Sequence, residues 1–361
     1  MDGHTEDGRE QSSAESSFAA DSGVNVSIPA MIIGWTIGLA ALVALVWFIL
    51  HFGDIEAFFA AIRSANLGWL AGAVLCQAAT YACVAATWSR TLASSGVHYR
   101  LSSLFKLAVI ELFVNQALPT GGLSGSLVVA RGLSIRGIPS SIATAALLIG
   151  AGSYYAAYLI VGLIAFGLLW LHGGLTDGWL VTSVIFVVMV GFLAWVVFAV
   201  ARSDGRLLPK FALRWDAVQR LRGLWAQVQV EVMRNRRVLG ETVFLQALVF
   251  LLDVATLYST AHAVGAATDF SAAFSSFMLA SVVATVAPIP LGLGTFEATC
   301  TAILHVQGAS TESALAATLI LRGLTFWLPM LPGLWLLFQE NRRHRAHAQQ
   351  ARIAGKLKTR S

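Results

Sequence analysis

Five ionisable side chains interrupt segments that are otherwise apolar enough to lie inside a membrane: Glu111, Arg131, Asp253, Glu297 and Arg322. A charge at membrane depth is costly, so such a residue usually faces a polar cavity or an oppositely charged partner. We therefore expect Arg322 to pair with Asp253 or Glu297, and Glu111 to pair with Arg131. One interpretation is that these pairs only hold the helices together.

The alternative interpretation is a polar cavity that binds an anion. Arginine suits phosphate because its planar guanidinium bonds two oxygens at once and stays charged when it is partly buried. Carboxylates in such a cavity would form ion pairs or couple transport to protons, and the candidates are Glu111, Asp253 and Glu297. Asn115 follows Glu111 by four residues and so lies on the same face of a helix.

Two glycine-rich breaks provide a second kind of candidate. The stretches LPTGGLSGS and IPLGLGTFE align without a gap, which matches Pro119 with Pro290 and Gly121 with Gly292. Proline lacks an amide donor and glycine permits positive φ, so each break predicts a turn inside an apolar segment. Free backbone N–H groups at such turns favour phosphate. A repeat that breaks hydrophobic segments at matching points indicates a transporter binding site.

The elements that must position these residues are membrane-spanning helices. The chain has 361 residues, of which 57% are hydrophobic and 12% charged, with a mean hydropathy of +0.72. A soluble domain has roughly a quarter charged residues, so this composition predicts a polytopic membrane protein. Six segments have the length of a spanning helix: 31–50, 69–88, 141–170, 179–201, 243–264 and 314–338.

The positions of lysine and arginine predict the topology. Basic residues follow the segment 179–201 and end the chain, which indicates cytoplasmic loops rather than a nucleic-acid site. The two glycine-rich breaks must then turn back to the side from which they entered, the first to the cytoplasm and the second to the outside. The expected fold is all-α, with about six full spans and two re-entrant helical hairpins in an inverted repeat, and both termini inside. This architecture suits alternating access.

The same reasoning predicts five parts of the chain. Residues 1–28 form a disordered acidic cytoplasmic tail, and 29–202 the first membrane half with a hairpin at about 106–131. Residues 203–240 form an amphipathic cytoplasmic linker, for which partner binding is an alternative role. The second half covers 241–338, has 179–201 as its first span and contains a hairpin at about 272–312; 339–361 is a basic cytoplasmic tail.

Sequence motifs do not indicate catalysis, a metal centre or a cofactor. The three cysteines lie outside any Cys/His cluster with metal-ligand spacing. The motifs GxSxG, GxxxxGK[ST] and HExxH are absent. We expect a protein that is not an enzyme and that uses neither a cofactor nor a metal.

The residues around the two breaks carry a family resemblance. ELFVNQALPTGGLSG with ARGLSIRGIP, and PIPLGLGTFEA with LILRGLTFWLPMLPG, resemble the bacterial lysylphosphatidylglycerol synthase transmembrane domain family, over roughly residues 29–338. This is the flippase-like domain of the multiple peptide resistance factor, which also occurs as standalone membrane proteins. The resemblance implies a protein that moves an amphiphilic lipid between leaflets. It implies substrate-binding roles for Asn115, Pro119, Gly121, Gly122, Arg131, Gly292, Gly294, Glu297 and Arg322.

Two departures from the family pattern limit what carries over. Many standalone relatives have a Gly-Glu pair after the first turn, where this chain has Gly125-Ser126, so only Glu297 in the second copy supplies a carboxylate. The synthase relatives continue into an aminoacyl-transferase domain, whereas this chain is expected not to make the lipid itself. The implied partners are anionic phospholipids or polyprenyl-phosphate lipids, and possible envelope-lipid biosynthetic enzymes.

The implied location is the bacterial cytoplasmic membrane. Two other functions stay open from the sequence. One is a secondary transporter of a small soluble anion, and the other is a non-transporting membrane subunit of an envelope-lipid synthesis system.

Overall fold

A computed structural model describes residues 60, 62–117, 123–171, 184, 187–188, 190–191, 235–266, 268–287 and 290–340. Every regular element within these ranges is helical. The described residues exclude the segment 31–50, the predicted tail 1–28 and most of 179–201. They also exclude nearly all of the predicted linker 203–240 and of the predicted tail 339–361.

Four helices are long and apolar enough to cross a membrane. They are α4 (Leu67–Ser94), α7 (Ser140–Leu171), α11 (Arg236–Ala263) and the helix that starts as α14 (Thr311–Arg322) and continues to Glu340. A helix of 28 residues such as α4 is roughly 42 Å long, which exceeds the hydrocarbon thickness of about 30 Å. These helices cover the predicted spans 69–88, 141–170, 243–264 and 314–338, and confirm that these segments are long apolar helices.

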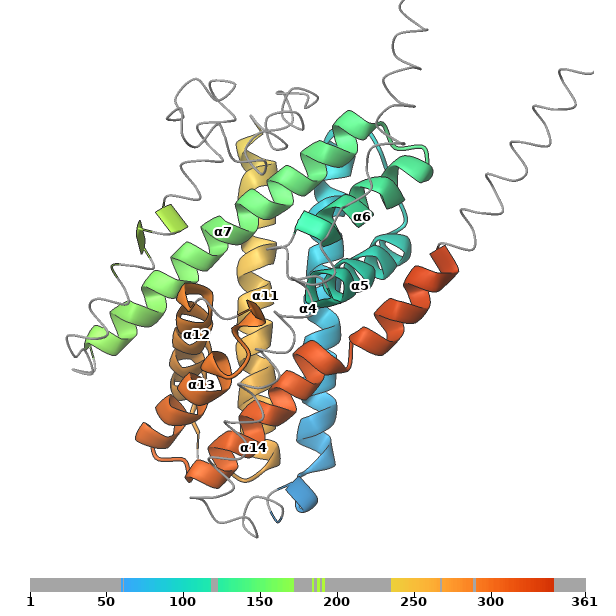
Figure 1. The fold of residues 1–361 in the computed structure, drawn as a ribbon. Helices are drawn as coiled ribbons and strands as arrows, with labels where there is room; N and C mark the ends of the chain where they lie inside the picture. The colour runs from blue at the N-terminus through green and yellow to red at the C-terminus, as the bar shows by residue number, and fades with distance from the viewer. Residues whose placement is uncertain are drawn as a thin grey trace, which may run out of the picture.

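Helices α4 and α11 form an antiparallel pair at the centre of the molecule (Figure 1). At one end the Asn66 amide donates to the Ala263 carbonyl over 2.8 Å. At the other end Arg90 lies 3.7 Å from Glu241. The side chain of Asn66 also caps α4 by accepting from the Gly68 and Trp69 amides, which satisfies donors that a helix start leaves free.

Two helical hairpins flank this pair. The first consists of α5 (Leu101–Ala117) and α6 (Leu123–Ile135), and the second of α12 (Phe270–Val286) and α13 (Thr295–Val306). The longest arms have 17 residues, or roughly 26 Å, so a single arm falls short of crossing the hydrocarbon layer. Figure 1 shows α5 and α6 at one end of the α4–α11 pair and α12 and α13 at the other.

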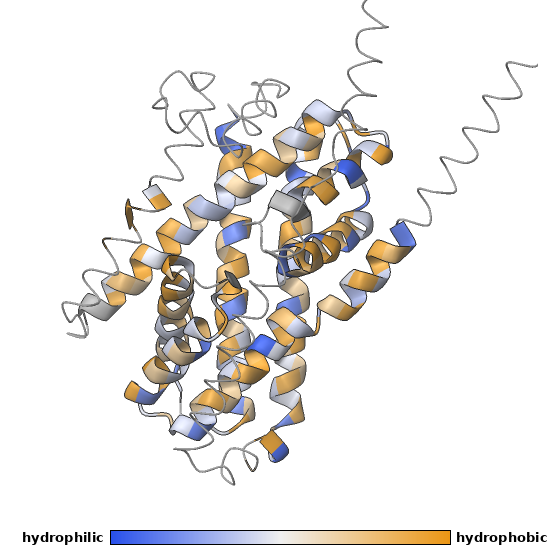
Figure 2. Cartoon of the chain, in the orientation of Figure 1, coloured by the Kyte–Doolittle hydropathy of each residue, from blue (hydrophilic) through white to orange (hydrophobic). Residues whose placement is uncertain are grey.

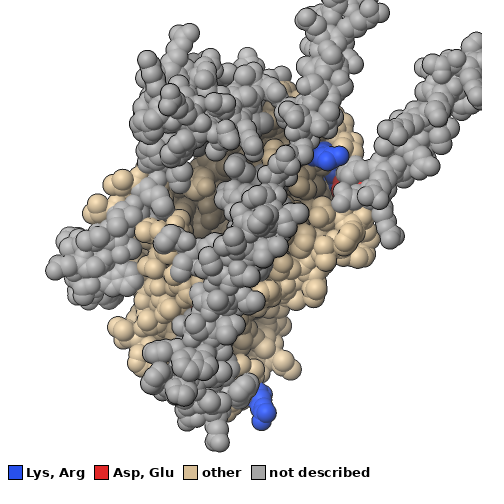
Figure 3. Space-filling model, in the orientation of Figure 1, with Lys and Arg blue, Asp and Glu red and all other residues tan. Residues whose placement is uncertain are grey.

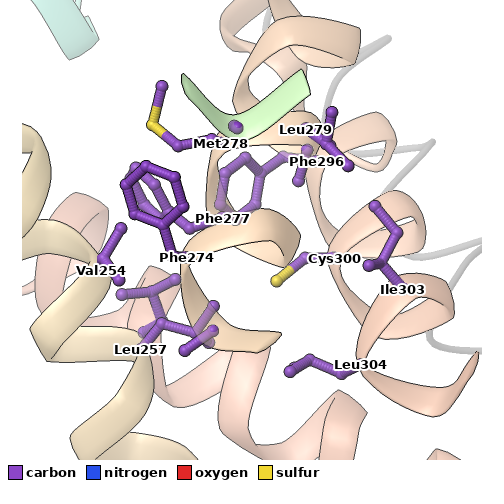
Figure 4. Close-up of a cluster of buried hydrophobic side chains, with 14 of the residues drawn as sticks. Val254, Leu257, Phe274, Phe277, Met278, Leu279, Phe296, Cys300, Ile303 and Leu304 are labelled. Atoms are coloured by element: carbon purple, nitrogen blue, oxygen red, sulfur yellow. The ribbon is translucent and has the colours of Figure 1, made fainter. Parts of the chain in front are cut away.

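The helices that carry the hairpins pack into two separate hydrophobic clusters. One joins α4, α5, α6 and the start of α7. The other joins α11, α12, α13 and α14 with the rest of α7. Figure 4 shows part of the second cluster, in which Phe277 and Met278 of α12 and Cys300 of α13 lie near Val254 of α11. The arms of the two hairpins therefore pack into different hydrophobic cores.

Figure 2 shows that hydrophobic residues predominate along the helices, with a few hydrophilic positions between them. Large hydrophobic side chains such as Leu75 and Phe244 are 70% and 67% exposed, respectively. On the described part of the face in Figure 3, lysine and arginine lie at the ends of the body, and the area between them is uncharged. Lipid chains are the surroundings that such a surface requires.

Candidate functional site

The second hairpin turns through a short irregular segment, the 3-10 turn η2 (Pro290–Gly292), before α13 starts. Leu291, Gly292 and Gly294 have φ values of 61°, 60° and 84°, a region that side chains other than glycine rarely adopt. A Cβ on Gly292 would also lie 3.3 Å from the Cα of Ala284 on α12. Glycine at 292 therefore permits both the turn conformation and the close approach of the two arms.

Glu297 and Arg322 together satisfy the backbone of this turn. Glu297 is 1% exposed, and its Oε2 accepts from the Gly294 amide at 2.7 Å. Its Oε1 accepts from Arg322 Nε at 2.7 Å. Arg322 Nη2 also donates to the Leu291 and Gly292 carbonyls over 3.3 and 3.4 Å. Irregular backbone at membrane depth needs such internal partners because lipid offers none.

Two aromatic rings lie against the guanidinium of Arg322. Its Cζ is 4.6 Å from the ring centre of Phe296 and 5.7 Å from that of Phe326. These distances suit cation–π attraction, which strengthens when the cation is desolvated. Among the described residues, none accepts a hydrogen bond from Arg322 Nη1, so the guanidinium retains donor capacity.

In the first hairpin, the side chain of Asn115 accepts a hydrogen bond from the backbone of the returning arm, as Glu297 does in the second. Asn115 on α5 accepts from the Gly125 amide at the start of α6, with 3.0 Å between Oδ1 and N. A Cβ on Gly125 would come within 2.7 Å of the Glu111 carbonyl, so this position also needs glycine. Three predicted site residues of this turn lie outside the described residues: Pro119, Gly121 and Gly122.

The expected pair between Glu111 and Arg131 is wrong. Glu111 on α5 hydrogen-bonds the side chain of Ser126 on α6. Arg131 is exposed and forms no ion pair with any described residue. The antiparallel arms place residue 126 opposite Glu111, whereas 131 lies further along α6. Of the two pairs that we expected, the structure forms the one between Glu297 and Arg322.

The last spanning helix connects the two hairpins. Directly after Arg322 it contains a π-helical turn, η3 (Gly323–Trp327), closed by a 2.7 Å bond from the Leu328 amide to the Gly323 carbonyl. Within this turn the Thr325 carbonyl accepts from Gln116 Nε2 of α5 over 3.1 Å. One helical segment thus binds the second hairpin through Arg322 and the first through Thr325. π-helical turns occur frequently at functional sites.

Asp253 takes part in neither pair. Gln77 Nε2 on α4 lies 3.4 Å from Asp253 Oδ1 and 3.0 Å from Thr80 Oγ1. The contact between Gln77 and Asp253 could not be predicted, because nothing in the sequence pairs α4 with α11. The only available signal was that both polar residues interrupt the middle of an apolar span.

Metal binding finds no support in the described part of the chain. No group of three or more His, Cys, Asp or Glu side chains there could hold a metal ion. Cys76, Cys83 and Cys300 are free thiols in the same ranges.

Comparison with known proteins extends these observations. The model of the lysylphosphatidylglycerol synthase TM region family matches residues 35–333. The chain is also similar to a "UPF0104 membrane protein" of Methanothermobacter thermautotrophicus, with 23% identity over 314 residues, which cover 81% of this chain and 90% of the relative. The family match and the four apolar helices identify a multi-pass membrane protein.

Proposed function

Since the chain belongs to the lysylphosphatidylglycerol synthase TM region family, we propose that it is a translocase in the bacterial cytoplasmic membrane that moves an anionic or phosphate-linked lipid between leaflets. One observation carries the proposal: Arg322 lies among membrane-embedded helices, bound to the broken backbone of a hairpin and to Glu297. A cation at this depth is costly and usually marks a substrate pathway.

The bonds of Arg322 suit an exchange of partners. Its contacts with the Leu291 and Gly292 carbonyls are 3.3 and 3.4 Å long, longer than the roughly 2.7–2.9 Å typical of charge-assisted bonds. A lipid phosphate offers two charged oxygens to the two terminal nitrogens of the guanidinium. It would replace weak contacts with strong ones while Glu297 keeps Nε in place.

The arrangement of the hairpins supports movement between leaflets. The two hairpins start from opposite ends of the α4–α11 pair. In the proposed topology of six spans, two re-entrant hairpins and cytoplasmic termini, one hairpin opens to each side. A headgroup could then pass from one polar turn to the other while its acyl chains stay in the bilayer.

The proposal is tested by measuring lipid movement in liposomes that contain the purified full chain. Labelled anionic phospholipid and labelled polyprenyl-phosphate lipid are compared with a zwitterionic phospholipid and with inorganic phosphate. We expect movement of one of the phosphate-bearing anionic lipids. R322A should reduce the rate by at least about tenfold, because a lost hydrogen bond to a charged group contributes about 1.5–3 kcal/mol.

R90A provides the matched control, because Arg90 forms an exposed ion pair at the end of α4, away from the turns. Its rate should equal that of the wild-type chain. Uptake of inorganic phosphate without lipid movement would instead indicate a transporter of small anions. Absence of both activities, while an established flippase is active in the same liposomes, would indicate a non-transporting subunit and would overturn the proposal.

A further inference from the structure

A carboxyl group that forms no salt bridge with any described residue lies close to the middle of the central helix pair. Asp253 is within about one turn of the midpoint of α11, and its neighbour Gln77 is equally near the midpoint of α4. Each described salt bridge joins other residues, and Asp253 belongs to none of them. Within the described ranges, an ionised carboxylate in this position has no opposite charge to offset the cost of leaving water.

The groups that face Asp253 from the described helices around it are neutral. Gln77 approaches Asp253 from α4, Tyr81 lies one turn after Gln77 on the same helix, and Tyr154 of α7 packs against Phe250, one turn before Asp253. Helix α12 has no acidic or basic residue between Phe270 and Val286. Helix α14 also packs against α11, but its arginine is bound to Glu297.

Two polar atoms beside Asp253 are buried without a hydrogen-bond partner: Gln77 Oε1 and the Tyr81 hydroxyl. The Tyr81 hydroxyl lies within reach of the Gln77 side chain, but neither it nor Gln77 Oε1 forms a well-aligned hydrogen bond with a described residue. A phenol can accept from a protonated carboxyl and donate to an ionised one. An unused buried polar atom costs about 1–3 kcal/mol. Gln77 Oε1 can only accept, so it favours a state in which Asp253 carries a proton to donate, whereas the Tyr81 hydroxyl can be a partner of either state.

A proton fits this cluster better than a metal cation does. Gln77 presents its NH₂ group to Asp253 Oδ1, whereas a hard cation is bound by oxygen atoms alone. The cluster also continues to the second hairpin. The ring centres of Tyr154 and Tyr158 on α7 each lie 5.2 Å from the ring centre of Phe250. Phe250 precedes Asp253 by about one turn of α11. The Tyr158 hydroxyl bonds Ser281 and Thr285 near the turn end of α12.

We infer that Asp253 is a proton-binding site, with Gln77 and Tyr81 as its hydrogen-bond partners, and that its protonation and release drive the movement of the lipid. This inference rests on the proposed function and adds the energy source of transport. The tyrosine contacts link the state of Asp253 to α12, the arm that leads into the turn bound by Arg322.

The first test imposes a pH gradient across liposomes that contain the full chain and a labelled anionic phospholipid. The gradient should change the rate of lipid movement by about 5–150-fold, which is the factor that corresponds to typical coupling free energies between two sites. D253N, which keeps the side-chain volume and the contact with Gln77, should respond to no gradient. E312Q removes a carboxylate from the first turn of α14 and should respond as the wild-type chain does.

A second measurement does not depend on transport. Infrared difference spectra of the purified chain at low and high pH should contain a protonated-carboxyl band that D253N lacks and E312Q retains. Y81F removes only the hydroxyl and should shift the midpoint of this titration without loss of thermal stability. A purely structural Tyr81 would leave the midpoint unchanged, which would contradict its role as a partner.

The outcomes separate the two proposals. If the wild-type chain moves no lipid under any gradient but the Asp253 band titrates, the proton site stands and the translocase proposal fails. If lipid moves equally with and without a pH gradient, or responds to a sodium gradient at constant pH, the inference of proton coupling is overturned and the translocase proposal stands. An identical infrared band in D253N would overturn the proton site itself.

Discussion

At the scale of single residues, the two hairpins solve the same problem with different side chains. Each returning arm begins with a backbone amide inside an apolar environment. Asn115 accepts from the amide of Gly125 in the first hairpin, and Glu297 accepts from that of Gly294 in the second. Only the acidic side chain also holds an arginine, so the charged chemistry is concentrated in the second hairpin.

Loss of Glu297 should destabilise the fold. E297A leaves the charge of Arg322 unpaired and the Gly294 amide without an acceptor, and breaking a buried pair costs about 3–5 kcal/mol. E297Q keeps an oxygen acceptor and should lose less. Thermal unfolding in detergent measures the difference, with E312Q as a control whose effect should stay below about 1 kcal/mol. Equal unfolding temperatures for E297A and the wild-type chain would contradict this account.

The glycine at 292 gives a second prediction. G292A forces a side chain into a positive φ and against Ala284, so it should cost about 1–3 kcal/mol of folding free energy. G152A is the matched control, because a Cβ there meets nothing within 4 Å and alanine favours the helix. The same thermal assay should show a lower unfolding temperature for G292A alone; equal losses in both variants would rule out turn strain as the cause.

At the scale of elements, helix length distinguishes spans from hairpin arms. The helices α4 and α11 have 28 residues each, whereas α5 and α12 have 17. The long pair forms an antiparallel centre, and each hairpin packs on its own side of it. The segment from Arg322 to Thr325 bonds to both hairpins, which makes this segment the place where a movement of one hairpin would affect the other.

The antiparallel pairing of α4 and α11 can be tested by crosslinking. In a cysteine-free background, N66C combined with A263C should react with a short bifunctional thiol reagent, because a 2.8 Å backbone bond joins these positions. N66C combined with E241C should not react, since 22 residues of helix, roughly 33 Å, separate positions 241 and 263. Gel mobility after crosslinking measures both. Crosslinking of the second pair would contradict the antiparallel arrangement.

At the scale of the whole molecule, the inverted arrangement predicts which ends face the cell exterior. His98 lies exposed after α4, at the end where α11 starts, and Val306 lies 84% exposed at the end of α13, near the start of α14. In intact cells a membrane-impermeant maleimide should label V306C and not H98C. After permeabilisation both should react. Labelling of H98C in intact cells would reverse the proposed orientation.

Much of the fold was predictable because hydrophobic length is a local property. Apolar stretches of sufficient length predicted α4, α7, α11 and the helix from Thr311 to Glu340, and the spans outside the described residues stay predictions. The repeated Pro-Gly breaks predicted two short hairpins. The first hairpin is longer than predicted and covers 101–135, and the second covers 270–306. The bounds differ because a helix ends where its backbone hydrogen bonds end, whereas the predicted bounds followed the positions of charged residues.

The importance of the residue types at the second turn was also predictable, since glycine in apolar sequence indicates a turn, and glutamate and arginine there require a partner. Which of them meet was decided by tertiary structure alone. The pairing of α4 with α11 places Gln77 beside Asp253. The register of the two arms in the first hairpin places Ser126 beside Glu111 and leaves Arg131 exposed. Helix register and packing depend on side chains distant in the sequence, so a linear pattern determines that a charge needs a partner, and only the packed structure decides which one it receives.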